Sequence, residues 1–307
     1  MNDRTTRRTF LAAAGGAVAA SSVATAGTGD VTTTRGDVVV RVSAGRWDDE
    51  RCSLPGSVLD RYGLVTGQQV RLWYGGTCAL FTVDRTDGDE AVVADDGAER
   101  LEAPEDDFTA ELDTQVVDPA VDETTAREEG GFVEASRSGT DLLAVAPHGG
   151  YIEYGTGDQA ERVADALGGG LWRCSGWSPG GGAYRRWHIT STDLHPDSLP
   201  ALADVAEDAY RHAVAFHGWS NDGVGVGGGA PRDVLEHVRD TVREHADGAF
   251  PVCLVADPAY DGTDPDNVVN WLTEGGDGGV QLEQGWSVRT DHRDVVADAV
   301  VAAFDSL

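Results

Sequence analysis

The stretch that decides the fold is LLAVAPHGGYIE, residues 142–153. Its first part, 142–146, is a short and fully apolar run, which is typical of a buried strand. His148 and Glu153 follow directly, separated by glycines that allow the backbone to turn closely. In open α/β sheets, ligands bind at the carboxyl ends of the strands, so this stretch predicts a strand that leads into a functional site.

The chain around this stretch alternates between apolar strands and amphipathic helices. We expect strands at 142–146, 187–190, 213–216, 251–255 and 280–282, and helices at 157–167, 199–210, 231–245, 267–271 and 293–304. Strands that alternate with helices indicate an α/β fold. The prediction is a mixed, mostly parallel sheet with helices on both faces, over residues 131–307.

The region before 131 has a different pattern. Short β-branched or apolar runs at 38–43, 69–74, 79–83 and 91–94, with a helix at 54–62, predict a small β-rich module over 37–103. Residues 104–130 are strongly acidic with little periodicity and are expected to be a linker.

The N-terminus has the three parts of an export signal. Arg7-Arg8 is a twin-arginine pair, an Ala-rich apolar run follows, and Ala24-Thr25-Ala26 forms a small-residue cleavage site. We therefore expect residues 1–26 to be a signal, 27–36 to be a flexible tether, and the mature protein to be extracellular or at the cell surface. The apolar run is too short to span a bilayer comfortably, and no other run reaches that length.

The charge balance is extreme: 53 acidic against 23 basic residues, a formal net charge of −30. All the basic residues are Arg, since Lys does not occur. This excludes unaided nucleic-acid binding and disfavours anionic membranes. Such a surface repels itself in dilute buffer, whereas in molar salt the Debye length is about 3 Å and the exposed charges are screened. The composition therefore indicates a halophile, in our interpretation an archaeon.

The four cysteines leave the redox state open. An even number in an exported protein permits disulfides, and the pairs Cys52–Cys78 and Cys174–Cys253 would each stay within one predicted domain. Four free thiols are the alternative. The CxxC pattern of a zinc knuckle is absent.

Ionisable side chains gather at the predicted strand ends. His148 and Glu153 follow one strand, His217 follows another, and Glu283 ends a third. Two imidazoles and a carboxylate can hold zinc and leave a coordination position for water. We therefore predict His148, Glu153 and His217 as ligands of one Zn²⁺ ion and Glu283 as the general base.

Other residues are candidates for contacts with the substrate. His188 is a structural, outer-shell or substrate-binding residue. Arg185, Arg186 and Arg289 are the nearest cations in sequence, and each could stabilise an oxyanion or hold a substrate carboxylate.

The blocks at 146–156 (APHGGYIEYGT), 188–191 (HITS), 216–218 (FHG), 267–270 (NVVN) and 280–283 (VQLE) resemble, in the same order, the signature of the phage-type poly-γ-glutamate hydrolases. The resemblance covers roughly 140–290. It implies a zinc carboxypeptidase-like fold, one zinc at the sheet edge, and cleavage of γ-glutamyl amide bonds within an anionic polymer. It also implies the same ligands and the same catalytic Glu283, and it adds Asn267 and Asn270 as candidates for substrate or oxyanion contacts.

Two departures bear on the substrate. Tyr151 stands where a small residue is common, and Trp271 stands where Arg often follows the second Asn. A zinc hydrolase of another amide, such as a cell-wall peptide or an N-acyl amino acid, is therefore an alternative. The other alternative is a non-enzymatic cell-surface binding protein.

Overall fold

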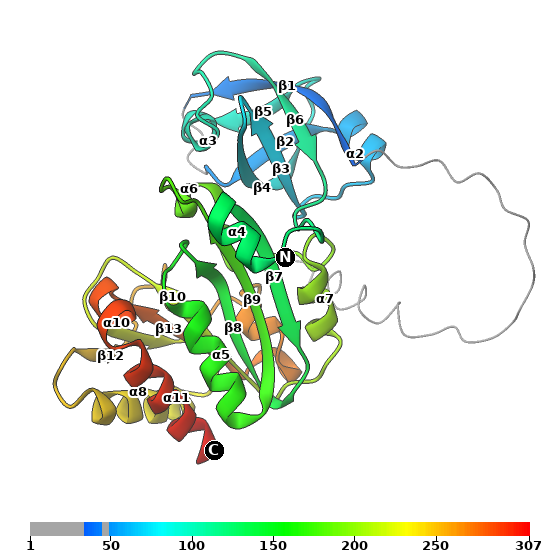
Figure 1. The fold of residues 1–307 in the computed structure, drawn as a ribbon. Coiled ribbons are helices and arrows are strands. Elements are labelled where there is room, and N and C mark those ends of the chain that lie inside the picture. Colours follow the sequence, from blue (N-terminus) through cyan, green and yellow to red (C-terminus); the bar gives the residue numbers. More distant parts are fainter. Residues whose placement is uncertain (1–33, 45–48) are drawn as a thin grey trace, which may run out of the picture. The chain divides into compact units, whose positions relative to one another are not determined.

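The computed structural model describes residues 34–44 and 49–307. The predicted export signal, 1–26, and most of the predicted tether lie outside the described residues. The described strands form two sheets: a closed barrel in the order β1-β5-β2-β4-β3-β6, and a seven-stranded sheet in the order β12-β11-β13-β10-β8-β9-β7 (Figure 1).

The closed barrel corresponds to the small β-rich module predicted from the sequence. Its elements are β1 (Arg35–Ser43), β2 (Arg51–Pro55), α2 (Gly56–Tyr62), β3 (Gln69–Tyr74), β4 (Thr77–Thr86), β5 (Ala91–Ala94), α3 (Asp95–Arg100) and β6 (Phe108–Asp113). The inward-facing side chains are apolar and buried, among them Val40, Leu72 and Phe81. Closure pairs β6 with both β1 and β3, so no strand edge of the barrel is left open.

The prediction of a linker over 104–130 is wrong in part, because this acidic stretch contains regular secondary structure. It contains β6 and α4 (Glu123–Glu129). In β6, Phe108, Ala110 and Leu112 are buried while Thr109 and Glu111 are exposed. The acidic residues on the solvent side hide this period of two. The predicted tether also ends early, because β1 begins at Arg35.

The second sheet is mixed, as expected. Its elements, with those around it, are β7 (Gly131–Arg137), β8 (Thr140–Gly150), α5 (Thr156–Leu167), β9 (Gly169–Trp177), α6 (Ala183–Trp187), α7 (Pro200–Ala206), β10 (His212–Gly218), β11 (Val224–Gly227), α8 (Arg232–Ala246), β12 (Val252–Leu254), α9 (Val268–Trp271), η1 (Glu274–Gly276), β13 (Gly279–Gln284), α10 (Trp286–Asp291) and α11 (Arg293–Asp305). The central strands β13, β10, β8 and β9 are parallel, β11 is antiparallel to β13, and β7 is antiparallel to β9.

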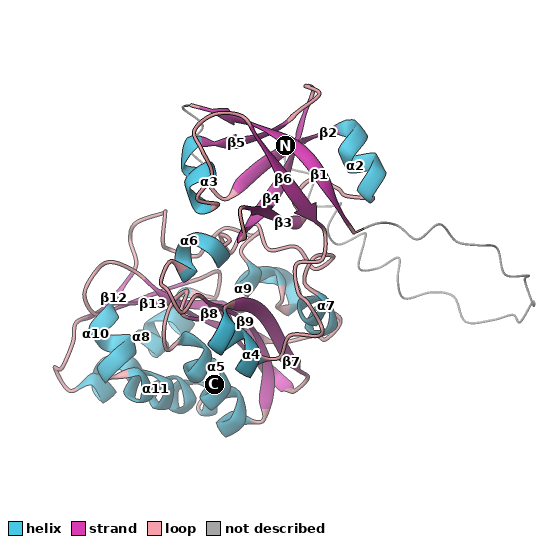
Figure 2. Ribbon diagram, turned by 45° about the horizontal axis from the view of Figure 1, so that its top comes forward, coloured by secondary structure: helices cyan, strands magenta, loops and turns pink. Residues whose placement is uncertain are grey.

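Helices cover both faces of this sheet (Figure 2). Leu142, Ala144 and Ala146 of β8 join the core beneath α5, α8 and α11. Leu143 and Val145 point the other way, into the core that includes α7 and α9. The apolar run of 142–146 is continuous because both of its faces are buried.

Two local predictions in this half are wrong. Residues 187–190, expected as a strand, are the end of α6 and the loop after it; the N–H of His188 donates to the carbonyl of Tyr184 at 3.0 Å, a helical hydrogen bond. The helix expected over 199–210 covers only Pro200–Ala206. In both cases a short apolar pattern reflects burial in the core rather than the element type.

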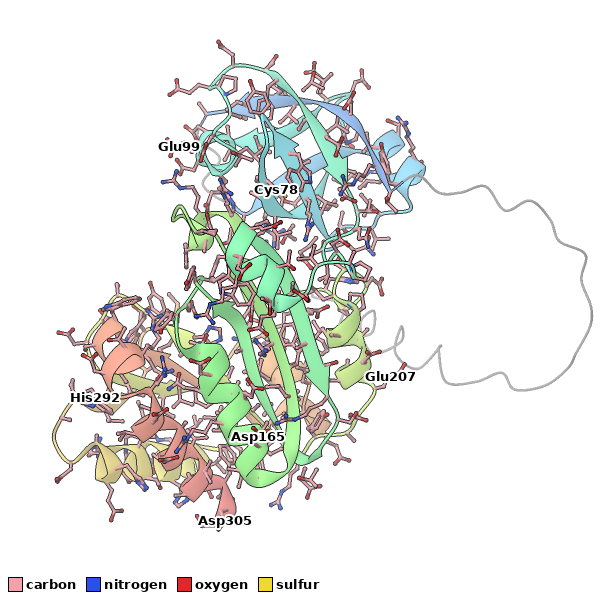
Figure 3. The ribbon with its side chains drawn as sticks, in the orientation of Figure 1. Cys78, Glu99, Asp165, Glu207, His292 and Asp305 are labelled. Carbon is pink, nitrogen blue, oxygen red and sulfur yellow. The ribbon has the colours of Figure 1, made fainter. Side chains whose placement is uncertain are left out.

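The disulfide pairs are also wrong, since all four cysteines are free. Cys52, Cys78 and Cys174 are buried core residues, whereas Cys253 is exposed. Many acidic side chains project into solvent, including the labelled Glu99, Asp165, Glu207 and Asp305 (Figure 3). Within residues 34–44 and 49–307, the structure has no helix whose length and apolar character would suit a bilayer crossing.

Candidate metal centre

The carboxyl ends of three neighbouring strands bring the predicted site residues together. Strand β10 lies between β8 and β13 and is parallel to both. Its His217 is the register partner of Glu283 on β13. Parallel strands end at one edge of the sheet, so His148, His217 and Glu283 come to this edge from three separate segments.

The tight turn after β8 adds Glu153 to the same edge. The backbone N–H of Glu153 donates to the carbonyl of His148 at 2.8 Å and closes the turn. Gly150 has a φ of +70°, which a residue with a side chain rarely adopts. A Cβ at Gly149 would lie 2.7 Å from the carbonyl oxygen of Cys174 on β9. These glycines explain how two ligands five residues apart can face one point.

Three side chains form a compact buried group. Nδ1 of His148 lies 3.2 Å from Nδ1 of His217 and 3.2 Å from Oε2 of Glu153, and Nδ1 of His217 lies 3.5 Å from the same oxygen. A tetrahedral ion with ligands at about 2.0–2.1 Å would hold its ligand atoms about 3.3–3.4 Å apart. The spacing therefore fits a zinc-sized ion, and the three residues can hold a metal.

The hydrogen bond of the His148 imidazole agrees with this. Nε2 of His148 donates to the carbonyl oxygen of Ile189 at 2.9 Å, which leaves the lone pair on Nδ1 facing the group. Nε2 of His217 is buried without a hydrogen-bond partner among the described residues. Acceptors packed against one another are unfavourable unless a cation lies between them.

In the His148–Glu153–His217 group, the interactions between the imidazoles and the carboxylate shift the pKa values more than burial does. Burial by itself raises the pKa of Glu153, but the charges and hydrogen bonds of His148 and His217 hold that pKa well below the ordinary value. Burial by itself lowers the pKa of His148, and Glu153 more than reverses this. Oε2 of Glu153 also accepts from the N–H of Gly218 at 2.9 Å. Glu153 is thus held as a carboxylate at the edge.

Glu283 lies beside this group but has a different environment. Burial raises its pKa, and the nearby charge of His217 only partly opposes this. Its Oε1 accepts from Nε2 of Gln281 at 2.9 Å, and Oε1 of Gln281 accepts from Nδ2 of Asn267 at 2.9 Å. The sequence analysis did not single out Gln281, although its place two residues before Glu283 puts it on the same face of β13.

The three arginines predicted to contact the substrate lie in different parts of the structure. Arg289 reaches the edge: a Cβ on Gly218 would lie 2.5 Å from its Cζ, and it interacts electrostatically with Glu153 and Glu283. Arg186 lies 3.6 Å from Glu102 at the barrel, and Arg185 is exposed on α6. The structure therefore brings only Arg289 of these three cations to the group.

The two asparagines position backbone and side chains. Asn267 caps α9 and donates to Gln281. Asn270, predicted to contact substrate or oxyanion, donates both amide hydrogens, to the carbonyls of Gly262 and Asp264, and accepts from the N–H of Gly229. Its hydrogen-bonding groups are used by the loops around it, so the contacts that Asn270 makes here support the backbone of those loops.

The ring of His188 packs against the ring of the candidate ligand His148, with centroids 4.1 Å apart and an interplanar angle of 35°. Its Nδ1 bonds Glu50 of the barrel region, and Arg100 of α3 donates to its carbonyl oxygen at 3.0 Å. The sequence analysis missed Glu50 and Arg100. Nothing local marks either residue among so many charged neighbours, and only the tertiary contact identifies them.

Comparison with known proteins gives two similar solved structures. The chain resembles the structure of a bacteriophage poly-γ-glutamate hydrolase, with 26% identity over 57% of this chain and 88% of that one and a TM-score of 0.48. A zinc-free structure named YNDL gives 21% identity, coverages of 57% and 89%, and a TM-score of 0.46. No curated protein matches.

The match to a family model decides the relationship. The model described as poly-gamma-glutamate hydrolase matches residues 121–294, more than half of the chain, and this range contains all of the predicted metal ligands and Glu283. The chain therefore belongs to the poly-γ-glutamate hydrolase family.

Proposed function

We propose that this protein is an exported, zinc-dependent hydrolase that cleaves γ-glutamyl amide bonds in poly-γ-glutamate. The observation that carries the proposal is the buried His148–Glu153–His217 group with Glu283 beside it at the same sheet edge. The family match supports hydrolysis, and the ligand spacing supports a zinc-sized ion.

A zinc ion held by His148, Glu153 and His217 would supply Lewis acidity, which would activate water near neutral pH and polarise the amide carbonyl. The chain's own residues then have defined tasks. Glu153 keeps its negative charge between the imidazoles, and Ile189 fixes His148 in the tautomer whose Nδ1 faces the ion.

Glu283 is the general base of the proposed reaction. Its carboxylate removes one proton from the attacking water as the C–O bond forms, and it passes that proton to the amide nitrogen as the C–N bond breaks. A raised pKa suits a group that must both take and return a proton. Gln281 and Asn267 hold the carboxylate in position.

Arg289 is the cation best placed for the charge that develops on the substrate. Its guanidinium donates to the carbonyl oxygens of Gln284 and Tyr154 at 3.2 and 3.1 Å, which fixes it beside Gly218. A fixed cation next to the reacting group can stabilise an oxyanion or hold a substrate carboxylate.

The test is to incubate the protein with poly-γ-glutamate in molar salt and follow polymer size by gel filtration, with and without a chelator. We expect shortening that the chelator abolishes and zinc restores. A folded, zinc-loaded sample that leaves the polymer intact would overturn the substrate assignment and favour another amide. Release of chain ends only, rather than mid-sized fragments, would exclude internal cleavage.

A further inference from the structure

The barrel region contributes a buried carboxylate to the surroundings of His188, which packs against the candidate ligand His148. Glu50, directly before β2, is 8% exposed. One of its oxygens, Oε1, bonds Nδ1 of His188. The other, Oε2, accepts from the backbone N–H of Thr190 at 2.7 Å and from its hydroxyl at 3.0 Å. Both oxygens are therefore engaged by the loop that follows α6.

His188 is held from several directions at once. Tyr184 stacks on its ring with centroids 4.3 Å apart, and His148 lies against it at 4.1 Å. Nη2 of the buried Arg100 donates to its carbonyl oxygen at 3.0 Å, and Nη1 of the same guanidinium lies 3.7 Å from Oε1 of Glu50. Little freedom remains for this imidazole.

Stability alone does not require this arrangement. Pairing must offset the free energy that burial of a carboxylate costs, and a well-packed apolar contact would serve docking at least as well. Pairing of Nδ1–H with Glu50 leaves Nε2 with its lone pair. Among residues 34–44 and 49–307, the side-chain hydrogen bond of His188 is made by Nδ1, with Glu50.

We propose that Glu50 is a positioning residue for the hydrolytic reaction: it fixes the tautomer and ring plane of His188, so that Nε2 accepts a hydrogen bond from a secondary amide N–H of the substrate. This inference rests on the proposed hydrolase function. It makes the barrel part of the active site, although Glu50 and Arg100 lie outside the 121–294 range of the family match.

Glu50→Gln is the sharpest variant. The N–H of Thr190 requires an acceptor, so the new amide turns its oxygen towards Thr190 and its NH₂ towards Nδ1 of His188. That reverses the tautomer and makes Nε2 a donor. We expect kcat/KM on poly-γ-glutamate to fall about 10-fold or more with unchanged zinc content. In a His188→Ala background, Glu50→Gln should cost nothing further.

Asp193→Asn is the matched control. Nη2 of Arg51 lies 2.6 Å from Asp193, so this variant weakens another ion pair between the same two regions. We expect its kcat/KM to change by less than about twofold. An equal loss in Asp193→Asn and Glu50→Gln would reduce the role of Glu50 to docking and overturn the inference.

A readout without turnover separates this inference from the substrate assignment. Two-bond ¹H–¹⁵N NMR of the metal-free protein reports the His188 tautomer, with His188→Ala identifying the signal. We expect Nδ1–H in the wild type and Nε2–H in Glu50→Gln. An unchanged tautomer, or an equal activity loss with and without His188, would overturn the inference. If the wild type cleaves no poly-γ-glutamate, the proposed function fails while this spectrum still decides the positioning.

Discussion

The barrel interior is filled by side chains such as Val40, Leu72 and Phe81, whereas the edge of the seven-stranded sheet buries Glu153 and Glu283 among histidines. Burial of apolar surface stabilises a fold by about 25 cal/mol per Å². Burial of ionisable groups costs free energy unless each group is paired. The barrel core therefore serves stability, whereas the sheet edge carries a buried group of ionisable residues that could hold a metal ion.

We expect the largest effect from removal of one of the proposed metal ligands at the sheet edge. His217→Ala deletes one of two imidazole donors, and we expect loss of bound zinc and a fall in kcat on the order of 10³-fold or more, because several kcal/mol of transition-state stabilisation depend on the metal. Elemental analysis and polymer cleavage measure both. His237→Ala, on α8 and bonded to Ala303, is the control. A zinc-loaded, active His217→Ala protein would refute the ligand assignment.

Glu283→Gln sharpens the division of tasks at the edge. The amide keeps the shape and can still accept from Gln281, but it cannot take a proton from water. We expect kcat to fall by about 10²–10⁴-fold while zinc stays bound. Glu274→Gln, at an exposed position, controls for loss of one negative charge. Wild-type kcat in Glu283→Gln would remove Glu283 as the base.

Gln281→Ala tests whether the edge depends on its supporting hydrogen bonds. Glu283 would lose the N–H that holds its Oε1, and Asn267 would lose its acceptor. We expect about a 10-fold fall in kcat/KM with zinc retained, as is usual for residues that orient catalytic groups. The exposed Gln115→Ala is the control. No change in kcat/KM would show that Glu283 needs no such support.

Acid stability tests Glu50, the buried carboxylate of the barrel region that pairs with His188. Burial raises the pKa of Glu50, but His188 and Arg100 lower it from the ordinary 4.5 to about 2. Its contribution to stability is therefore present above pH 4.5 and is lost as the pH falls towards 2. The contribution is at most about 3 kcal/mol, at about 1.4 kcal/mol per pKa unit. Urea unfolding at pH 6 and pH 3 should show a smaller acid loss in Glu50→Gln than in the wild type; parallel losses would argue against the pairing.

Salt should act on the exposed acidic surface and hardly on the buried edge. We propose that the protein is exported and works in molar salt, where a surface of net charge −30 no longer repels an anionic polymer. We expect kcat/KM to rise severalfold between dilute and molar salt through KM, with little change in kcat. A folded protein whose KM is constant or rises with salt would contradict this proposal.

The α/β half was readable from sequence because its signals are local. Apolar runs such as Leu142–Ala146 are long enough to mark buried strands, and ionisable residues directly after them mark the strand ends. The acidic surface hid other elements from the sequence analysis. In β6, buried and exposed residues alternate as in a half-buried strand, but the exposed Glu111 and the acidic residues around it gave the segment the composition of a linker. Residues 187–190 were misread because burial of Trp187 in a helix looks locally like a strand.

The sequence by itself determined which residue types stand at the strand ends, and therefore the chemistry: His148, Glu153 and His217 as possible metal ligands, with Glu283 as a base. Only the tertiary structure decided which other side chains reach them. It brought Arg289 to the edge, used Asn270 for loop backbone, and carried Glu50 to His188. Periodicity and spacing describe neighbours along the chain, whereas Glu50 and His188 are 138 residues apart and meet only because the barrel region contacts the α6 loop.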